Sequence, residues 1–290
     1  MKLFNTILIT ILVSILFSCT SVNNNRPILL AESFTYLTMH VIIEVCGPTK
    51  EHGFQCLKLE PRKYSASGSV IKHIKESSYV LTAAHFCDID RDKVIKDVVN
   101  PTLVASLFIN VKEVKVNVLI EVLDGTGFTR IGKVINTNPL LDMCILETDR
   151  INVQAIKLAS APPKIGDTIW NLASPLGIII PNGVPILKGV YSGDVTLNAG
   201  RVVSVITDLP AVPGCSGSPV IDVRGNLIGM IYSTNMHFKE LSYAVSLKQV
   251  RKYLEKVFFI NKDKNPVTSG STTLEVEIDP INTPSPPPLK

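Results

Sequence analysis

Charged residues are scarce in this sequence, and the familiar cofactor motifs are missing from it. Asp, Glu, Lys and Arg make up 19% of the 290 residues, below the roughly 25% that is usual for soluble domains. Low charge combined with many Val, Ile, Thr and Gly residues favours strands over long surface helices. No C2H2 or CxxC spacing, P-loop or GxGxxG motif occurs. His73 and His237 have no ligand-like companions, so we expect them at the surface, and we expect no metal or other cofactor.

A clustered basic face, which nucleic-acid-binding proteins usually need, is also missing. The net charge is only +4, from 29 basic and 25 acidic residues scattered along the chain. We therefore expect no nucleic-acid partner. Hydrophobic residues, in contrast, make up 46% of the chain. This is enough for the core of one large all-β domain or of two small lobes.

The N-terminus has no apolar run long enough for a typical membrane-spanning helix, which needs about 20 residues. Lys2 is followed by an almost unbroken apolar run from Leu3 to Phe17, and then by Ser18 and Cys19. A basic start, a short apolar stretch and a small residue before a cleavage site are typical of an export signal. Residues 16–19 also resemble a bacterial lipobox, in which Cys19 would become the lipidated first residue. An ordinary cleaved signal and an uncleaved anchor are the alternatives.

Removal of Cys19 would leave an odd number of cysteines, which cannot all pair within one chain. The five are Cys46, Cys56, Cys87, Cys144 and Cys215. An exported protein can form disulfides. Because Cys87 closely follows His85, a bridge from Cys87 to Cys56, or to Cys46, would clip the segment that carries this histidine. Connectivity does not follow from the sequence, and five reduced cysteines are the alternative.

Short apolar runs separated by turn signals occupy the chain between residues 35 and 258. We expect strands at 69–71, 78–82, 114–120, 132–135, 143–146, 168–172, 202–206, 219–221 and 227–232. Asp124-Gly125 predicts a hairpin turn. Many short strands with close turns are typical of a sandwich or a barrel. Apolar residues at helical spacing predict one helix from Ser246 to Phe258, and the Pro- and Thr-rich residues 261–290 are expected to be extended or disordered.

Three segments carry the residue types of nucleophilic catalysis, in the order His, Asp, Ser. In the first, an apolar strand ends in two small residues before His85, which leaves the imidazole room to face a cleft. In the second, Asp142 opens a strongly apolar strand, where a carboxylate is costly unless other groups hydrogen-bond to it. In the third, Ser216 lies between Gly214-Cys215 and Gly217, so backbone N–H groups can point into one cavity. Each segment alone fits a surface histidine, an exposed aspartate or a simple loop.

Together these segments resemble the trypsin-like serine protease superfamily, and in particular its bacterial Deg (HtrA-type) branch. The resemblance covers most of residues 66–250 and is carried by residues 68–71, 81–85, 138–142, 173–177, 213–217, 225–229 and 242–245. It implies an all-β fold of two six-stranded antiparallel barrels with a C-terminal helix.

The resemblance also implies how the chain is divided. The N-terminal barrel would comprise residues 35–150 and the C-terminal barrel residues 151–260. An export segment (1–19) and a polar tether (20–34) would precede them, and a tail (261–290) would follow. We expect no PDZ domain after the helix, because the tail is too short for one.

The function implied by the resemblance is that of an exported serine endopeptidase acting on polypeptides. Ser216 would be the nucleophile, His85 the general base, and Asp142 the group that orients the imidazole. The N–H groups of Gly214 and Ser216 would form the oxyanion hole. An extended substrate would pair with a strand end formed by Tyr232, Ser233 and Thr234.

The sequence departs from its trypsin-like relatives at three positions around this serine. Cys215 stands where digestive-type relatives carry the acid that pairs with a newly cut N-terminus, so we expect no such switch. Ser218 is a second serine in the motif, but Pro219 beside it and the family register favour Ser216 as the nucleophile. Pro210 stands where trypsin would carry an acid for Lys or Arg, so we expect no strong preference for basic side chains.

Two other functions are compatible with the sequence. One is a catalytically inactive homologue that binds extended peptides at the cell envelope. The other is a structural envelope lipoprotein in which the three motifs occur by chance. For the leading interpretation we expect the bacterial cell envelope, with the protein anchored through a lipidated Cys19 and facing the periplasm or the exterior.

Overall fold

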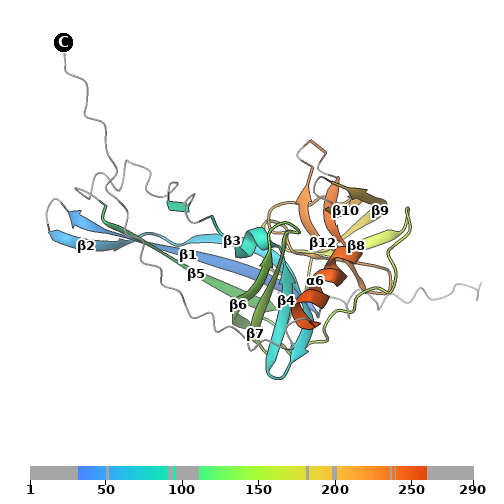
Figure 1. Cartoon of the computed structure of the whole chain (residues 1–290), viewed down its shortest axis with the longest axis horizontal. Coiled ribbons are helices and arrows are strands. Elements are labelled where there is room, and N and C mark those ends of the chain that lie inside the picture. The colour runs from blue at the N-terminus through green and yellow to red at the C-terminus, as the bar shows by residue number, and fades with distance from the viewer. Residues whose placement is uncertain are drawn as a thin grey trace, which may run out of the picture.

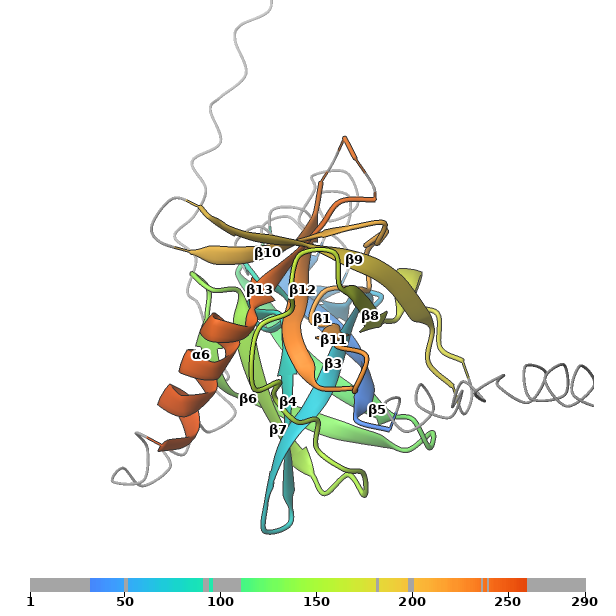
Figure 2. The ribbon, with the colours of Figure 1, turned by 90° about the vertical axis from the view of Figure 1, so that its right-hand side faces the viewer.

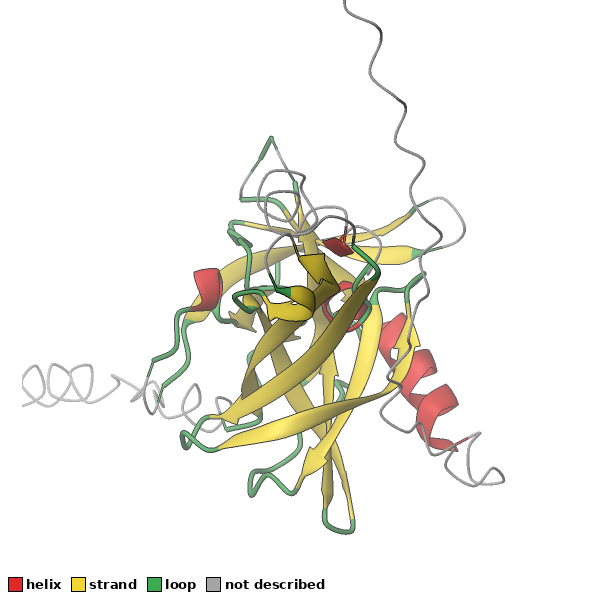
Figure 3. Ribbon diagram, turned by 90° about the vertical axis from the view of Figure 1, so that its left-hand side faces the viewer, coloured by secondary structure: helices red, strands yellow, loops and turns green. Residues whose placement is uncertain are grey.

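A computed structural model describes residues 32–49, 52–90, 94–95, 111–180, 183–197, 201–235, 237–238 and 240–259. The predicted export segment with Cys19, most of the predicted tether and the predicted tail lie outside these residues. Figure 3 shows that strands make up most of the described chain. Among its helices, none combines the length and apolarity that would be needed to cross a bilayer.

The strands before residue 150 form the first barrel. They are β1 (Phe34–Thr49), β2 (Gly53–Lys58), β3 (Arg62–Ile74), β4 (Ser77–Thr82), β5 (Glu113–Asp124), β6 (Thr129–Asn138) and β7 (Met143–Asp149), with the short helix α3 (Ala84–Cys87) after β4. Their order in the sheet is β2-β1-β3-β4-β7-β6-β5, and β1 also pairs with β5. The β1–β5 pairing is antiparallel and closes six of the seven strands into a barrel.

The long strand β1 lies partly in the first barrel and partly in an extension beyond it. Alternate residues of β1 face the core of the first barrel: Leu37, Met39, Val41, Ile43 and Val45. The outer end of β1, from Glu44 to Thr49, pairs with β2. Figure 1 shows this end extending with β2 and β5 as a ribbon away from the two barrels.

The second barrel follows a linker that leaves β7. Its elements are β8 (Thr168–Leu172), the 3-10 turn η1 (Pro175–Gly177), β9 (Ile186–Thr196), β10 (Val202–Thr207), β11 (Pro219–Ile221), β12 (Leu227–Thr234) and β13 (Ser242–Ser246). Six strands close in the order β10-β13-β12-β11-β8-β9. The expected double barrel is therefore confirmed.

The predicted C-terminal helix is present as α6 (Leu247–Phe259), which begins directly after β13. Its apolar residues Val250, Tyr253 and Val257 are buried against the barrels. The Tyr253 hydroxyl donates a hydrogen bond to the Asn136 carbonyl oxygen of β6 at 3.2 Å. Figure 2 shows α6 lying along the outside of the strands, close to β13 and β6.

An apolar cluster joins the two barrels. It combines Leu81, Ala83, Met143 and Ile145 from the first barrel with Leu227, Met230 and Val245 from the second. Full burial of a Leu or Met side chain stabilises a fold by about 2 kcal/mol. The interface is therefore a packed core that fixes the ends of β4 and β7 relative to β12.

Two disulfides lie in the first barrel, and neither is the predicted one. Cys46 bonds to Cys56 and Cys87 bonds to Cys144, so the expected bridge between Cys87 and Cys56, or Cys46, is wrong. Cys46 and Cys56 face each other in the register of β1 and β2. Cys144 lies opposite Thr82 at the end of β4, next to the helix that carries Cys87. Strand register decides both pairings, and the sequence does not display it.

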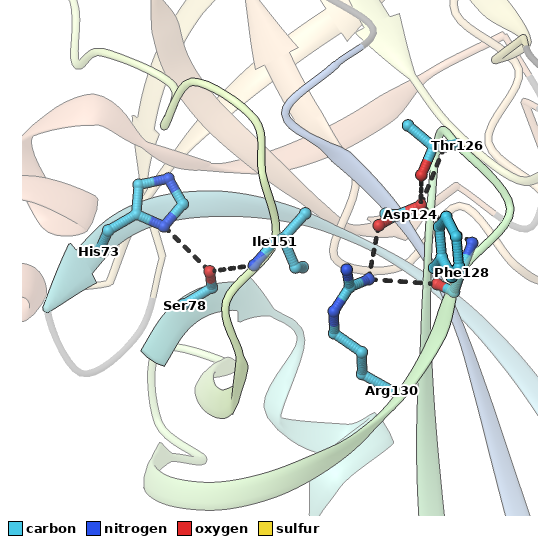
Figure 4. A network of polar contacts seen from close by, with 7 residues as sticks. All are labelled: His73, Ser78, Asp124, Thr126, Phe128, Arg130 and Ile151. Carbon is cyan, nitrogen blue, oxygen red and sulfur yellow. Dashed lines mark hydrogen bonds and ion pairs between the residues drawn. The ribbon is translucent and has the colours of Figure 1, made fainter. Parts of the chain in front are cut away.

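The predicted hairpin turn at Asp124 is confirmed and is built around a buried carboxylate. Asp124 accepts hydrogen bonds from the N–H groups of Thr126 and Phe128 at 2.9 and 3.1 Å, and from Arg130 Nη1 at 2.5 Å, as Figure 4 shows. Burial alone would raise the pKa of Asp124, but the hydrogen bonds from Thr126, Arg130 and Phe128 outweigh burial and lower the pKa.

His73, which was expected at the surface, is half-buried and hydrogen-bonded. Its ring is partly buried, with Nδ1 2.9 Å from Ser78 Oγ and Nε2 2.8 Å from the Val153 carbonyl oxygen. The Ser78 hydroxyl also accepts a hydrogen bond from the Ile151 N–H at 2.8 Å (Figure 4). This network ties the β3–β4 hairpin to the linker between the barrels, so His73 has a structural role.

Replacement of the cation beside Asp124 is expected to destabilise the fold. Arg130→Leu should lower the free energy of unfolding at pH 7 by about 3 kcal/mol, because it leaves a buried carboxylate without its charged partner. The pKa of Asp124 is lower in the folded chain, so its stabilising effect is present above about pH 4 and is lost as the pH falls through the folded pKa. Urea unfolding should therefore show a smaller difference from wild type at pH 3 than at pH 7.

The matched control is Arg224→Leu, which replaces an exposed arginine. We expect a change within about 0.5 kcal/mol for a surface position of this kind. Equal losses for the two arginines, or a pH-independent loss for Arg130→Leu, would contradict the role assigned to the pair.

Candidate active site

His85 lies in α3, directly after the buried end of β4. Ala83 and Ala84 are buried at the junction and Phe86 anchors the short helix in the core. The small side chains let the backbone turn into α3 without steric conflict. The His85 side chain itself remains 50% exposed. The backbone of His85 is therefore fixed, while its imidazole ring stays partly exposed to solvent.

Asp142 occupies the turn between β6 and β7. The turn is held by two hydrogen bonds, from the Leu141 N–H to Asn138 Oδ1 at 3.1 Å and from the Asp142 N–H to the Pro139 carbonyl oxygen at 3.2 Å. Asp142 has a φ of 54°, a left-handed conformation that Asp tolerates better than most residues. This conformation directs the carboxylate toward α3.

Both oxygens of the Asp142 carboxylate accept hydrogen bonds from His85. The His85 backbone N–H lies 2.9 Å from Oδ1, and the ring Nδ1 lies 2.8 Å from Oδ2. A carboxylate only accepts, so Nδ1 carries the proton and Nε2 is left as the free basic nitrogen. The two residues expected to work together are therefore adjacent.

The pKa of Asp142 is lower than the usual value for Asp. Burial would raise it, but the hydrogen bonds and charge of His85, together with the more distant charge of Arg201, outweigh burial. Asp142 thus stays ionised beside the imidazole ring.

The turn that carries Ser216 comes from the second barrel and packs against the first. Gly217 has a φ of 82°, and a Cβ there would lie 2.2 Å from Thr82 Oγ1 and 2.9 Å from the Ala83 nitrogen. Only glycine fits this approach. The serine turn therefore contacts the segment that leads into His85. Within the described chain the Ser216 hydroxyl makes no hydrogen bond, to His85 or to any other group.

The backbone N–H groups of this turn fall into two sets. Those of Cys215, Gly217 and Ser218 donate to backbone carbonyl oxygens at 2.8 to 3.0 Å. Those of Gly214 and Ser216 make no hydrogen bond within the residues that the structure describes. These two N–H groups are the donors predicted for an oxyanion hole.

The environments of the two candidate serines are different. Ser218 is fully buried, and its hydroxyl accepts a hydrogen bond from Asn171 Nδ2 at 2.7 Å. Ser216 is partly exposed. Cys215 between them is a free, buried thiol whose pKa is raised by burial. Of the three side chains, that of Ser216 alone is open to solvent.

Tyr232, Ser233 and Thr234 form the end of β12. β13 pairs with this end on one side, while β11 pairs with β12 no further than Met230. The described strands thus leave the other edge of these three residues unpaired. An extended peptide could add to that edge.

Three neighbours of the site were not identified from the sequence. Ser67 and Thr82 join the serine turn to the first barrel, with the Thr82 hydroxyl donating to the Ser67 carbonyl oxygen at 2.8 Å. The guanidinium of Arg201 lies 3.8 Å from the centre of the Tyr232 ring, a cation–π contact. Thr82 lies within the histidine motif, although no role was assigned to it there, and no sequence motif marks Ser67 or Arg201. Among the described residues no group of three or more His, Cys, Asp or Glu side chains could hold a metal ion.

Curated relatives share part of this chain. The "Probable periplasmic serine endoprotease DegP-like" of Pseudomonas putida is 28% identical over 121 residues, which are 40% of this chain and 24% of the relative. The "Putative serine protease HhoB" of Synechocystis is 23% identical over 139 residues, 47% of this chain and 33% of the relative. The chain thus spans a quarter to a third of the length of these relatives.

Solved structures share the fold. The active form of the Rv3671c protease from M. tuberculosis superimposes with a TM-score of 0.53 at 18% identity, covering 85% of this chain and 88% of that one. The HtrA-type protease AlgW with a tripeptide gives a TM-score of 0.53 at 17% identity, covering 82% of this chain and 64% of that one.

The matching family model is the trypsin-like peptidase domain, over residues 66–230. This range contains His85, Asp142, Ser216 and the interface between the barrels. The chain therefore belongs to the trypsin-like peptidase domain family, with its relatives in the Deg/HtrA branch.

Proposed function

We propose that this chain is an exported serine endopeptidase whose catalytic triad is His85, Asp142 and Ser216. One observation carries the proposal: Asp142 holds both the backbone N–H and the ring Nδ1 of His85, on the segment against which the serine turn packs. The arrangement supplies an oriented base and a serine with an unengaged hydroxyl. Family membership supports a peptidase.

In this proposal each triad residue has a distinct task. Ser216 Oγ attacks the scissile carbonyl carbon while His85 Nε2 takes its proton, because a neutral hydroxyl is a weak nucleophile. Asp142 holds Nδ1–H and stabilises the imidazolium that forms. His85 then gives the proton to the leaving amine. Water hydrolyses the resulting Ser216 ester by the same base-assisted route and releases the acid product.

The unengaged N–H groups of Gly214 and Ser216 are the proposed oxyanion hole. Negative charge develops on the carbonyl oxygen as Ser216 attacks, and donors already in place stabilise it without reorganisation. One such donor lowers the barrier by about 3–4 kcal/mol. These two groups have no competing acceptor within the described chain, as this role requires.

The proposed substrate is a polypeptide bound in extended form along Tyr232, Ser233 and Thr234. The unpaired edge of β12 supports this mode of binding. The tripeptide in the AlgW structure, which has the same fold, supports a polypeptide as the ligand. Backbone hydrogen bonds would supply affinity, and side-chain pockets would supply specificity. The absence of a strong Lys or Arg preference, inferred from Pro210, stays a prediction.

We also propose that the chain works at the bacterial cell envelope. Its curated relatives include a protein named as a periplasmic endoprotease, and residues 1–19 have the pattern of an export signal. Lipidation at Cys19 would anchor the barrels to a membrane through the polar residues that follow.

Removal of the nucleophile is the first test. Ser216→Ala should lower kcat for peptide hydrolysis by about 10⁶-fold and abolish labelling by a fluorophosphonate probe, which reacts with activated serines. The control Ser160→Ala, at an exposed position, should behave like wild type. A wild-type chain that binds peptides but neither labels nor cleaves would instead be the inactive, peptide-binding homologue.

A second test addresses the tautomer of the base. Asp142→Asn should lower kcat by about 10⁴-fold, because the new amide group can hold His85 with the proton on Nε2, where it cannot accept the serine proton. Steady-state kinetics near neutral pH would measure the loss. Asp149→Asn, at the exposed end of β7, is the matched control, and similar losses in both variants would argue against the triad.

The anchor is tested on the mature protein. If Cys19 is lipidated, mass spectrometry of protein purified from bacterial membranes should find an N-terminal cysteine carrying acyl chains. The Cys19→Ala variant should then appear in the soluble fraction. An unmodified N-terminus starting at another residue would exclude the lipoprotein.

A further inference from the structure

Ser67 of β3 is the point at which four segments of the site meet. It is fully buried. Its N–H donates to the Ser216 carbonyl oxygen at 2.9 Å, and its hydroxyl donates to the Gly214 carbonyl oxygen at 2.8 Å. The hydroxyl also accepts from the Ser174 N–H at 2.9 Å, and the Ser67 carbonyl oxygen accepts from Thr82 Oγ1 at 2.8 Å. One residue of the first barrel thus binds both the serine turn and the end of the histidine strand.

The bonds from Ser67 act on the peptide groups that flank the proposed oxyanion donors. The peptide between Gly214 and Cys215 is held at its oxygen by the Ser67 hydroxyl and at its nitrogen by the Val212 carbonyl oxygen. The peptide between Ser216 and Gly217 is held at its oxygen by the Ser67 N–H. Fixing a peptide group at both ends prevents it from rotating.

The N–H groups of Gly214 and Ser216 belong to the two peptide groups that alternate with those just described. The carbonyl oxygens of these two peptide groups accept hydrogen bonds from the Leu176 N–H at 2.7 Å and from the Ser218 N–H at 3.0 Å, respectively. With the intervening peptide groups clamped, both free N–H groups keep one orientation. Gly214, with a φ of 94°, has no side chain that would restrict rotation in the absence of the clamp.

We propose that Ser67 is a positioning residue that holds the serine turn in the arrangement from which both oxyanion donors face the substrate. This inference rests on the proposed function. It assigns to a first-barrel hydroxyl the task of placing donors that belong to the second barrel. Thr82, at the end of the strand that leads into His85, also binds Ser67. The positions of His85 and of the oxyanion donors are therefore both set relative to Ser67.

Ser67→Ala tests the proposal because it deletes the hydroxyl and keeps both backbone hydrogen bonds. We expect kcat to fall about 10- to 100-fold, since catalytic donors displaced by about 1 Å lose this much rate. KM should stay within about twofold because the substrate edge of β12 is untouched. Affinity for a peptide boronate, which forms a tetrahedral adduct at the nucleophile, should fall by the same factor as kcat.

The matched control is Ser69→Ala, on the same strand. Ser69 is also buried, but its hydroxyl has no hydrogen-bond partner, so we expect kcat within about twofold of wild type. The acid limb of the pH profile of kcat/KM should be the same in wild type and Ser67→Ala, because neither His85 nor Asp142 is altered. A merely structural loss would lower the amount of folded protein without changing the ratio of boronate to substrate affinity.

Thr82→Val is the second variant, in case Ser67→Ala does not fold. It removes the bond to the Ser67 carbonyl oxygen with little change in shape, so it should lower kcat in the same direction but less, again at constant KM. Unchanged kcat in a folded Ser67→Ala or Thr82→Val, or a loss confined to KM, would refute the role of Ser67 alone. A wild-type chain that is neither labelled nor active would refute the proposed function and the inference with it.

Discussion

The enclosed carboxylate of Asp142 is the constraint on which the site depends. Its side chain is only 13% exposed, and a carboxylate in such a place is costly unless donors satisfy it. Both donors come from His85, one from the backbone and one from the ring. Any arrangement that satisfies Asp142 therefore also fixes the position, plane and tautomer of the imidazole. The hydrogen bonds that a buried carboxylate needs are thus also those that the proposed triad requires.

The proposed nucleophile comes from the second barrel, and close packing of the two barrels brings its turn to the first. The apolar cluster holds the ends of β4 and β7 against β12. Gly214 and Gly217 then allow the serine turn to touch the backbone of its neighbours. A side chain at Gly217 would push the serine turn away from the first barrel, and a side chain at Gly214 would push it away from the backbone around η1. Gly214 and Gly217 thus combine close packing with a positive φ that residues with side chains rarely adopt.

Local patterns in the sequence predicted nine of the strands and α6, because these follow from the spacing of apolar residues. The strands β1, β2, β9 and β13 were not among the ranges predicted in this way. The omission includes β1, although Leu37, Met39, Val41, Ile43 and Val45 alternate as a half-buried strand should. The bridges were mispredicted for a different reason. Cys144 reaches Cys87 only because β4 and β7 pair in one register, and register is a property of the closed barrel.

Different kinds of bond hold the two halves of the site, which are the His85 and Asp142 segments and the Ser216 turn. This difference explains why sequence motifs identify some residues of the site and not others. The segments of His85 and Asp142 are tied by a disulfide close to each, Cys87–Cys144, besides their own hydrogen bonds. The Ser216 turn is held across the interface by hydrogen bonds centred on Ser67. Sequence motifs identify the proposed reacting groups because catalysis needs fixed residue types at fixed positions. The Ser67 hydroxyl joins the two halves only when both barrels are folded, so no pattern in the sequence identifies it.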